Sequence, residues 1–368
     1  MDVYILADFW LAQIGGIGPA GRKILETIFG NICNLFLSSS DEVRICMKKY
    51  AVSSIKKKYR IPASVIDDLA DPDCRIRIID EYNRIQKNDI IFIRKNDPMY
   101  PDRLTCIQNP PEQLFLIGRL PDPEQKAIGI IGARNCTPYG RDMARMFAYR
   151  LAQAGMAVIS GMAKGIDGWA HRGALDAGGD TFAVLGCGVE ICYPTSNSKI
   201  YRELKERGGV LSEYPTKYGA FAQNFPLRNR IISGLSDGVL VVEARIRSGS
   251  LITADAALEQ GKDVFVIPGR IGDELSIGCN RLILQGAIPV LSPEDILEYY
   301  HLERKSDDST GLSGEEQQLL ELIGATPISL SQLAASMQGT YANTLRLVMS
   351  LKKKRYIRET SRDHYIRL

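Results

Sequence analysis

The sequence predicts an α/β fold in which helices cover both faces of a doubly wound, mostly parallel sheet. Between residues 127 and 300, short apolar runs of strand length alternate with patterns of helical period. The run Val239-Leu240-Val241-Val242 is apolar without interruption, as expected for a parallel strand that is buried on both faces. A chain of 368 residues is long enough for this domain and for one or two others.

The composition is that of an ordinary globular protein, with 45% hydrophobic residues, 24% charged residues and a net charge of +3. None of the eight cysteines forms a C-x-x-C pair, and there are only three histidines. We therefore expect no metal site, no cofactor, and free thiols in a reducing cytoplasm. No apolar run of about 18 residues occurs, and the N-terminus lacks a signal-peptide pattern. These features predict a cytoplasmic protein without a membrane segment.

Residues 1–65 are expected to form a helical domain. The segment Ile14-Gly15-Gly16-Ile17-Gly18-Pro19 resembles the turn of a helix-hairpin-helix or SAM-like domain. Glycines in such a turn let backbone amides approach a phosphate closely. The alternative is that the segment is only the tight turn of a small helical domain. The basic clusters Lys48-Lys49 and Lys56-Lys57-Lys58 are either a solvated helix face or a DNA-binding patch.

Residues 66–126 are expected to connect this domain to the sheet and to supply the first strands. Ile90 to Ile93 and Leu114 to Ile117 have the apolar composition of strands. Between them, Asp97 to Pro101 and Asn109-Pro110-Pro111 are typical of turns.

Residues 127–300 are expected to form the parallel core of the sheet. Met143, Phe147 and Leu151 repeat every four residues before Gly155, which indicates a helix between the first two core strands. The seven expected strands are Ala127–Ile131, Met156–Ser160, Thr181–Leu185, Gly209–Ser212, Gly238–Val242, Asp263–Ile267 and Ala287–Leu291.

The carboxyl ends of these strands are rich in glycine and serine and carry several cations. In doubly wound sheets ligands bind beyond the carboxyl ends of the strands, and so many similar loops at one edge exceed what turns require. We therefore expect a phosphate-binding edge. The segments concerned are Gly132-Ala133-Arg134-Asn135, Ser160 to Gly168, Gly186-Cys187-Gly188, Ser212-Glu213-Tyr214-Pro215, Ser248-Gly249-Ser250 and Pro268-Gly269-Arg270.

The segment from Phe225 to Ala257 holds the strongest of these signals. Arg228 and Arg230 flank Asn229, and Ser248-Gly249-Ser250 leads into a helix. At such a helix start, free backbone N–H groups and the positive end of the helix dipole point outward. Two arginines nearby in the chain favour a phosphate as the anion.

The motifs of common nucleotide-binding proteins do not fit this edge. The chain has no G-x-x-x-x-G-K-[ST] loop, and Gly129-x-x-Gly132 after the first core strand does not match the dinucleotide fingerprint. Asp167, His171 and Asp176 are either an acid–base set or structural residues, with Asp167 as the cap of its helix.

Residues 301–313 are polar and are expected to be a linker. Residues 314–368 are expected to form a winged helix, with three helices between Glu315 and Lys354 and a hairpin from Tyr356 to Arg367. Winged helices bind either duplex DNA, through the third helix, or protein, and both possibilities stay open here. The end of this segment is basic, with Lys352, Lys353, Lys354, Arg355, Arg358, Arg362 and Arg367.

Together these motifs resemble those of the DNA-processing protein A family, DprA, also called Smf. The resemblance covers residues 85–300. One departure is Ala133, where serine is common in the family, and a backbone turn accepts either residue. The matching segments are Gly132-Ala133-Arg134 with Tyr139-Gly140, Ser160 to Asp167, Tyr193-Pro194-x-x-Asn197, Ser212 to Pro215, Phe225 to Ile232, Val242-Glu243-Ala244, Ser248 to Ala254 and Gly278-x-Asn280.

The resemblance implies an extended Rossmann-like domain that binds single-stranded DNA and is not an enzyme. Members act as homodimers, protect incoming strands during natural transformation and help to load the RecA recombinase. By motif match, the expected phosphate contacts are Arg134, Lys164, Arg228 and Arg230, with Asn229 beside them and Lys199 as a further cation. The expected backbone or hydroxyl donors are Gly132, Ser160, Gly161, Ser248, Gly249 and Ser250. Candidates for stacking on bases are Phe182, Tyr193 and Phe225.

Two other functions remain open. Related sheets with glycine-rich edges cleave or sense nucleotides, and Glu243 lies where a catalytic carboxylate could. Cations spread over several loops favour a strand of nucleic acid over a single mononucleotide. The same groove could also serve a sensor or defence protein. The apolar segment from Leu282 to Leu297 is a candidate surface for a dimer or for RecA.

Overall fold

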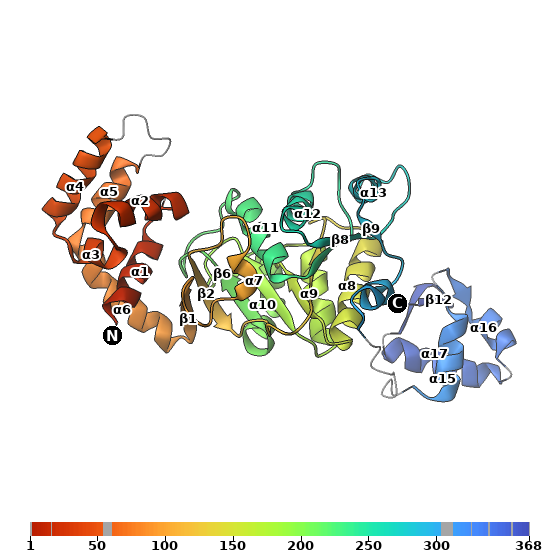
Figure 1. The fold of residues 1–368 in the computed structure, drawn as a ribbon. Helices are drawn as coiled ribbons and strands as arrows, with labels where there is room; N and C mark the ends of the chain where they lie inside the picture. Colours follow the sequence, from red (N-terminus) through yellow and green to blue (C-terminus); the bar gives the residue numbers. More distant parts are fainter. Residues whose placement is uncertain are drawn as a thin grey trace. The chain divides into compact units, whose positions relative to one another are not determined.

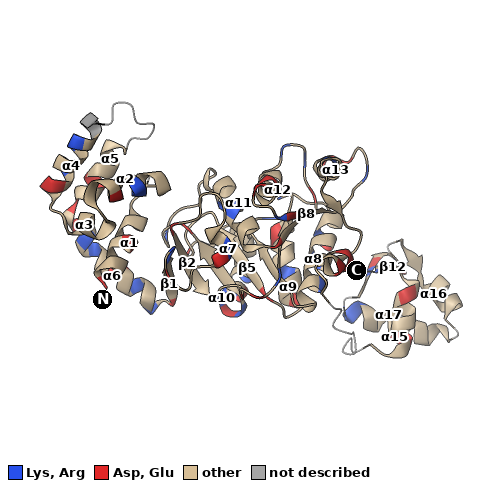
Figure 2. Cartoon of the chain, viewed as in Figure 1, with Lys and Arg blue, Asp and Glu red and all other residues tan. Residues whose placement is uncertain are grey.

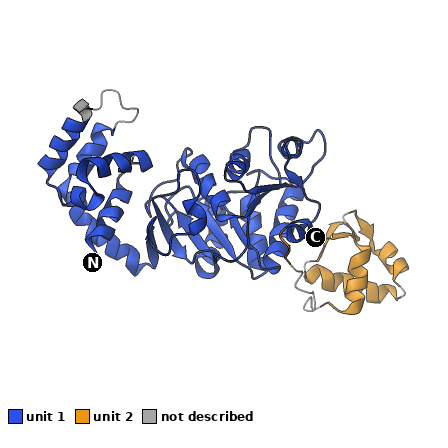
Figure 3. Cartoon of the chain, viewed as in Figure 1, with its two compact units in different colours: residues 1–299 blue, residues 300–368 orange. Residues whose placement is uncertain are grey.

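The computed structural model describes residues 2–15, 17–53, 61–302, 312–324, 326–337, 339–354 and 356–367. The chain divides into two compact units, residues 1–299 and 300–368 (Figure 3). The basic cluster Lys56-Lys57-Lys58, the side chain of Arg355 and most of the expected linker lie outside the described residues.

The larger unit is built around a nine-stranded sheet with the order β1-β2-β6-β5-β4-β3-β7-β8-β9 (Figure 1). The strands from β6 to β9 in this order are parallel, and β1 and β2 extend the sheet in antiparallel pairing. The mostly parallel sheet predicted from the sequence is therefore confirmed. The strands are β1 (Ile90–Arg94), β2 (Gln113–Gly118), β3 (Ala127–Ile131), β4 (Ala157–Ser160), β5 (Thr181–Leu185), β6 (Gly209–Ser212), β7 (Gly238–Val241), β8 (Asp263–Val266) and β9 (Ile288–Pro289).

The sheet is doubly wound around β3. The chain winds from β3 through β4 and β5 to β6, then returns to pair β7 with the other side of β3. Right-handed crossovers place helices on opposite faces when the winding direction reverses, and α11, α12 and α13 share one apolar core with the sheet. The helices of this part are α7 (Asp102–Thr105), α8 (Pro138–Gln153), α9 (Ile166–Asp176), α10 (Ser198–Arg207), α11 (Asn224–Leu235), α12 (Gly249–Glu259), α13 (Ile277–Leu284) and α14 (Pro293–Tyr299), with a 3-10 turn at Thr195–Asn197.

The central strands β3, β4, β5, β6 and β7 are buried along their whole length. For β7, the uninterrupted apolar run from Val239 to Val242 predicted this burial. The last strand differs from our expectation. We predicted five residues from Ala287 to Leu291, but β9 has only two. It ends at Pro289, which pairs with Val266, the last residue of its neighbour β8.

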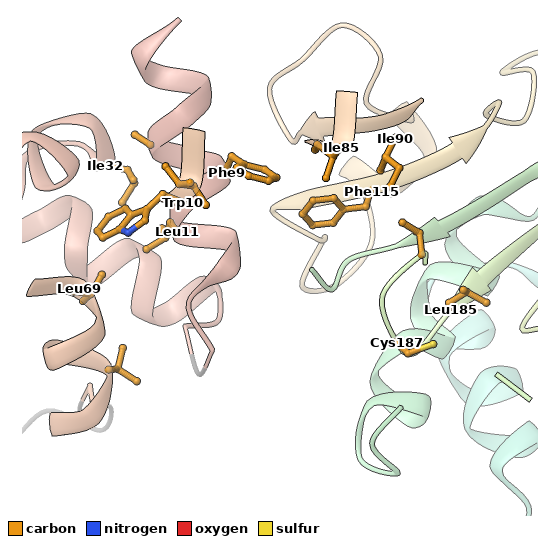
Figure 4. Close-up of a cluster of buried hydrophobic side chains, with 14 of the residues drawn as sticks. Phe9, Trp10, Leu11, Ile32, Leu69, Ile85, Ile90, Phe115, Leu185 and Cys187 are labelled. Carbon is orange, nitrogen blue, oxygen red and sulfur yellow. The ribbon is translucent and has the colours of Figure 1, made fainter. Parts of the chain in front are cut away.

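Among the residues that the structure describes before the sheet, six helices share an apolar core with its β1–β2 edge. Phe9 of α1 lies edge-to-face against Phe92 of β1 and Phe115 of β2, with ring centroids 5.2 and 6.1 Å apart. Figure 4 shows Phe9 and Phe115 among the side chains of this buried cluster. These aromatic contacts connect the helices to the sheet. The helices are α1 (Val3–Gln13), α2 (Pro19–Phe29), α3 (Ile32–Leu37), α4 (Ser40–Ser53), α5 (Ala63–Ala70) and α6 (Pro72–Lys87).

In its described residues, the smaller unit has three helices and a three-stranded sheet of order β10-β12-β11. Ser313 and Ser329 each close a capping box at the start of a helix. The Glu316 carboxylate also accepts hydrogen bonds from Lys354 at 2.8 Å and from Ser350, and these contacts hold the pKa of Glu316 at about 2. The elements are α15 (Gly314–Leu322), β10 (Ile328–Ser329), α16 (Leu330–Ser336), α17 (Tyr341–Lys353), β11 (Ile357–Ser361) and β12 (His364–Arg367).

Candidate functional site

The loops at the carboxyl ends of β3 and β4 pack directly against each other. Gly165 has a φ of +84°, and a Cβ there would overlap the carbonyl oxygens of Ala133 and Arg134. The backbone N–H of Ile166 donates to the carbonyl oxygen of Ala133 at 3.2 Å. Only glycine permits this approach, so the two loops form one continuous surface above the sheet.

Arg134 and Lys164 are the exposed cations of this surface. Lys and Arg are spread among Asp and Glu along the chain (Figure 2), so cations without a carboxylate are more informative than total charge. Within the described ranges, neither Arg134 nor Lys164 lies within ion-pair distance of a carboxylate. Both therefore have their full charge available for an anion.

An aromatic pair lies beside Arg134. The guanidinium carbon of Arg134 is 5.2 Å from the ring centroid of Phe225, and Tyr193 stacks on Phe225 at 5.5 Å with an interplanar angle of 26°. Tyr193 is 43% exposed and Phe225 is partly buried. Phe182, our third stacking candidate, is fully buried in β5, so that candidate is wrong in this fold.

Asn197 fixes the loop that carries Lys164. Its side-chain amide donates to the carbonyl oxygens of Met162 at 3.0 Å and Ala163 at 3.1 Å. Met162 has a φ of +53°, an uncommon conformation for a residue with a side chain. The Tyr-Pro-x-x-Asn motif therefore positions the β4 loop. Lys199, two residues later, is exposed on the first turn of α10.

Arg228 lies beneath the surface instead of on it. Its side chain is 3% exposed, and its guanidinium donates to the carbonyl oxygens of Gly161 at 3.0 Å and of Val184. Asp167, also buried, accepts the N–H of Gly161 at 3.2 Å. Burial lowers the pKa of Arg228 to about 10 and raises the pKa of Asp167, and the attraction between the two charges opposes both shifts. Arg228 thus joins the loop after β4 to the end of β5 from below.

The next two motif residues are also used internally. Arg230 makes a bidentate ion pair with Glu213, at 2.9 and 2.7 Å, and donates to the carbonyl oxygen of Asn109. Asn229 donates to the carbonyl oxygen of Gly249 at 3.2 Å. We expected contacts with phosphate from this motif, but here it ties α11 to the surrounding loops.

The predicted serine and glycine residues are also partly buried in internal contacts and partly exposed. Ser160 is fully buried and donates to the carbonyl oxygen of Ile130 at 2.7 Å. Ser248 caps α12, and its hydroxyl bonds that of the buried Ser250 at 2.7 Å. Gly249 is exposed with open space around it, and Gly132 and Gly161 lie partly or fully within the loop packing.

Sequence reasoning missed the arginines that precede α12. Arg247 is exposed on the loop after β7, and Arg245 of the same loop pairs with Glu274 at 3.2 Å. Arg270, which belongs to the predicted Pro268-Gly269-Arg270 segment, is exposed after β8. The sequence could have identified Arg245 and Arg247, because Arg245-Ile246-Arg247 directly precedes the predicted phosphate-binding segment Ser248-Gly249-Ser250.

Glu243, the carboxylate of the nucleotide-enzyme alternative, is buried in a structural contact. One of its oxygens accepts the backbone N–H of Thr137 at 2.9 Å, and the other accepts the Thr137 hydroxyl. Thr137 is the N-cap of α8. Glu243 therefore holds the start of α8, and neither oxygen is directed to solvent.

The other acid–base candidates are also structural. Asp176 pairs with Arg145 and Arg172. The N-cap of α9 is Gly165, so Asp167 is not the cap that we expected; it bonds the preceding loop instead. His171 is fully buried, and its Nδ1 lies 2.7 Å from the Thr181 hydroxyl. Across the described ranges, no group of His, Cys, Asp and Glu side chains could hold a metal ion.

We expect His171 to make the fold sensitive to acid. Burial and the nearby Arg228 lower its pKa to about 3, whereas an unfolded histidine titrates near 6.5. Between these values the unfolded chain binds an extra proton, so stability falls below pH 6.5 by up to about 1.4 kcal/mol per pH unit. Urea unfolding at pH 7 and 5.5 should show a smaller acid loss for His171→Asn than for the unsubstituted chain. Equal losses would assign the effect to other groups.

The helices of the described chain are all too short or too polar to cross a membrane.

The family model of DNA recombination-mediator protein A matches residues 91–301. Protein Smf of Escherichia coli K12 is 46% identical over 208 residues, which are 56% of each chain. Protein Smf of Synechocystis sp. PCC 6803 is 40% identical over 295 residues, 78% of this chain and 71% of that protein. The match thus spans little more than half the length of the E. coli protein.

Solved structures show the same likeness. DNA processing protein A of Streptococcus pneumoniae has a TM-score of 0.56 and 31% identity, over 77% of this chain and 98% of that one. The Helicobacter pylori protein, whose structure describes its single-stranded DNA binding mode, has a TM-score of 0.52 and 29% identity over 58% and 95%. The family model covers more than half of the chain, so the chain belongs to the family of DNA recombination-mediator protein A, as its motifs led us to expect.

Proposed function

We propose that this chain binds single-stranded DNA along the carboxyl edge of its sheet and catalyses no reaction there. One observation carries the proposal: the unpaired cations Arg134 and Lys164 lie on adjoining loops beside the stacked Tyr193–Phe225 pair. Cations along an edge can follow a row of phosphates, and aromatic faces accept bases of any sequence. The single-strand binding described for the H. pylori relative supports the same assignment.

The contacts divide the predicted site into two layers. Arg134, Lys164, Lys199 and Gly249 are exposed and would meet the strand. Arg228, Asn229 and Arg230 would act on DNA only indirectly, because their hydrogen bonds set the shape of the loops. Glu243 caps α8 through Thr137, which argues against a nucleotide-cleaving enzyme.

Competition binding tests this function. Fluorescence anisotropy would compare a labelled single strand with its duplex and with excess unlabelled mononucleotide as competitor. The proposal requires salt-sensitive binding of the single strand that mononucleotide does not displace. Equal affinity for duplex, or ready displacement by mononucleotide, would favour the nucleotide-binding alternative.

We infer that the smaller unit is a winged helix and that residues 1–65 form a helix-hairpin-helix or SAM-like domain. On α17, the third helix of the smaller unit, Lys352 pairs with Glu359 and Arg346 with Glu315. Lys354, just beyond α17, pairs with Glu316. These pairs neutralise three cations, whereas Lys353, Arg362 and Arg367 are exposed, so duplex DNA and protein both stay open as partners of this unit.

Deleting residues 310–368 is expected to leave single-strand affinity unchanged. The exposed cations and aromatic rings of the sheet edge all lie in residues 1–299, which form a compact unit by contact. Anisotropy titration of the truncated and full-length proteins at the same salt concentration checks this. Loss of binding in the truncated protein, with its circular dichroism intact, would move the main DNA site to the smaller unit.

We further propose that the chain forms a homodimer and passes its strand to the RecA recombinase during natural transformation. Leu284 at the end of α13 and Leu291 after β9 are 88% and 84% exposed, which is unusual for leucine. Leu284→Asp should halve the mass in light scattering, whereas Leu37→Asp, at an exposed leucine of α3, should not. An unchanged mass would show that this surface is not the dimer interface.

The proposed RecA role has its own test. It fails if the chain does not speed RecA filament formation on protein-coated single strands.

A further inference from the structure

Three aromatic side chains form an ordered array between β6 and α11. The rings of Tyr214 and Tyr218 stack at 5.3 Å with an interplanar angle of 12°. Phe221 contacts Tyr218 edge-to-face at 5.2 Å and 65°. Phe221 ends the array and is 50% exposed. The array therefore presents a ring that is held in place by protein contacts but still reaches solvent.

The backbone of this segment is fixed before any ligand binds. The N–H of Gly188 donates to the carbonyl oxygen of Tyr218 at 2.8 Å, and the N–H of Glu190 donates to that of Thr216 at 2.9 Å. Arg84 of α6 then joins the side chains of both Glu190, at 2.8 and 2.7 Å, and Thr216, at 3.0 Å. A surface that is already ordered loses little conformational entropy when it binds.

The array continues the surface described above. β6 lies next to β5 in the sheet, so the loop after β6 follows the loops after β3, β4 and β5 along the same edge. The N–H of Asn224 donates to the carbonyl oxygen of Phe221 at 3.0 Å, and its side chain donates to Gly186 at 3.2 Å. Phe225, the ring beneath Arg134, comes one residue later. A single turn of chain thus separates the two aromatic groups.

We propose that the Tyr214–Tyr218–Phe221 array is a second base-stacking subsite, which binds one unpaired base of a single strand on Phe221. Lys217, exposed within the same segment, would contact the adjoining phosphate. A base suits this place better than an apolar peptide, because the segment also carries an exposed cation, Lys217, and follows the loops that carry Arg134 and Lys164 along the same edge of the sheet. The inference rests on the proposed function and extends it by naming a further point of contact.

Phe221→Ala tests the subsite through oligonucleotide length. We would titrate a series of oligothymidylates into the unsubstituted protein and the variant. Short strands that reach only the Arg134 region should bind both proteins equally. For longer strands the variant should lose about tenfold in affinity, as expected for one lost base stack. Phe221→Trp should keep the affinity, and Leu227→Ala, at a residue 60% exposed in the next segment, should not change it.

A strand with a single abasic residue gives a second readout. At one position the missing base should weaken binding to the unsubstituted protein, and should not weaken binding to Phe221→Ala any further. Phe221→Leu, which removes the ring but keeps an apolar side chain, replaces the alanine variant if that variant unfolds. Equal affinity of the variant at every length, with no position-specific abasic effect, would overturn the subsite. If that occurred while Arg134→Ala still weakened binding, the proposed function would stand. Absence of any single-strand binding by the unsubstituted protein would overturn both.

Discussion

Replacing Arg228 by methionine is expected to destabilise the larger unit by about 2–5 kcal/mol, because each buried acceptor that is left without its donor costs about 1–3 kcal/mol. The substitution leaves Asp167 buried without its compensating charge. It also removes the donor to the carbonyl oxygens of Gly161 and Val184. Such a loss is a large part of the free energy of unfolding of a typical domain.

Urea unfolding measures this effect, with Arg207→Met as the matched control. Arg207 is an exposed arginine at the end of α10. The double variant Arg228→Met/Asp167→Asn should recover part of the lost stability, because it no longer buries an unpaired carboxylate. A loss below about 1 kcal/mol for Arg228→Met would show that Arg228 does not organise the loops.

Replacing Arg134 by alanine is expected to weaken single-strand binding by roughly tenfold or more. The guanidinium is exposed, has no carboxylate partner in the described ranges and lies over Phe225. A hydrogen bond to a charged group contributes about 1.5–3 kcal/mol, and 1.4 kcal/mol corresponds to a factor of ten in affinity. Stability should change little, because Arg134 is a surface residue.

Anisotropy titration at moderate salt checks the Arg134 prediction. Arg207→Ala removes the same charge and is the matched control. Arg207 precedes β6 and therefore lies at the amino edge of the sheet, opposite the proposed groove. Equal losses in the two variants would mean that net charge, and not position, determines affinity. No loss in Arg134→Ala would remove this residue from the site.

Much of the fold could be predicted from the sequence because apolar runs mark buried parallel strands. We did not predict α6, because few of its side chains are apolar and buried. Only Ile78 and Ile85 of its sixteen residues are buried apolar side chains, so its apolar stripe is thin. Its start was nevertheless signalled, since Asp71 caps the helix and Pro72 is its first residue.

The residue types of the candidate site could be predicted from the sequence, but which of its side chains face solvent could not. Arg134 and Arg228 both belong to family motifs, yet one faces solvent and the other the sheet. Helical spacing could have predicted that Arg228 is buried. It lies three and four residues before the buried Ile231 and Ile232 and therefore shares their face of α11. Phe182 could likewise have been excluded as a stacking residue, because it lies inside an uninterrupted apolar strand. The array at Phe221 depends on contacts within an irregular segment, which no periodicity predicts.

The salt dependence of binding tests most directly whether exposed cations of the sheet edge contact phosphates. For single strands, the slope of log affinity against log salt falls by about 0.7 for each phosphate contact that is lost. Arg134→Ala/Lys164→Ala should therefore lower the slope by about 1.4, twice that value, while Arg207→Ala leaves it unchanged. An unaltered slope in the double variant would contradict the account, because the strand would then contact phosphate-binding residues elsewhere.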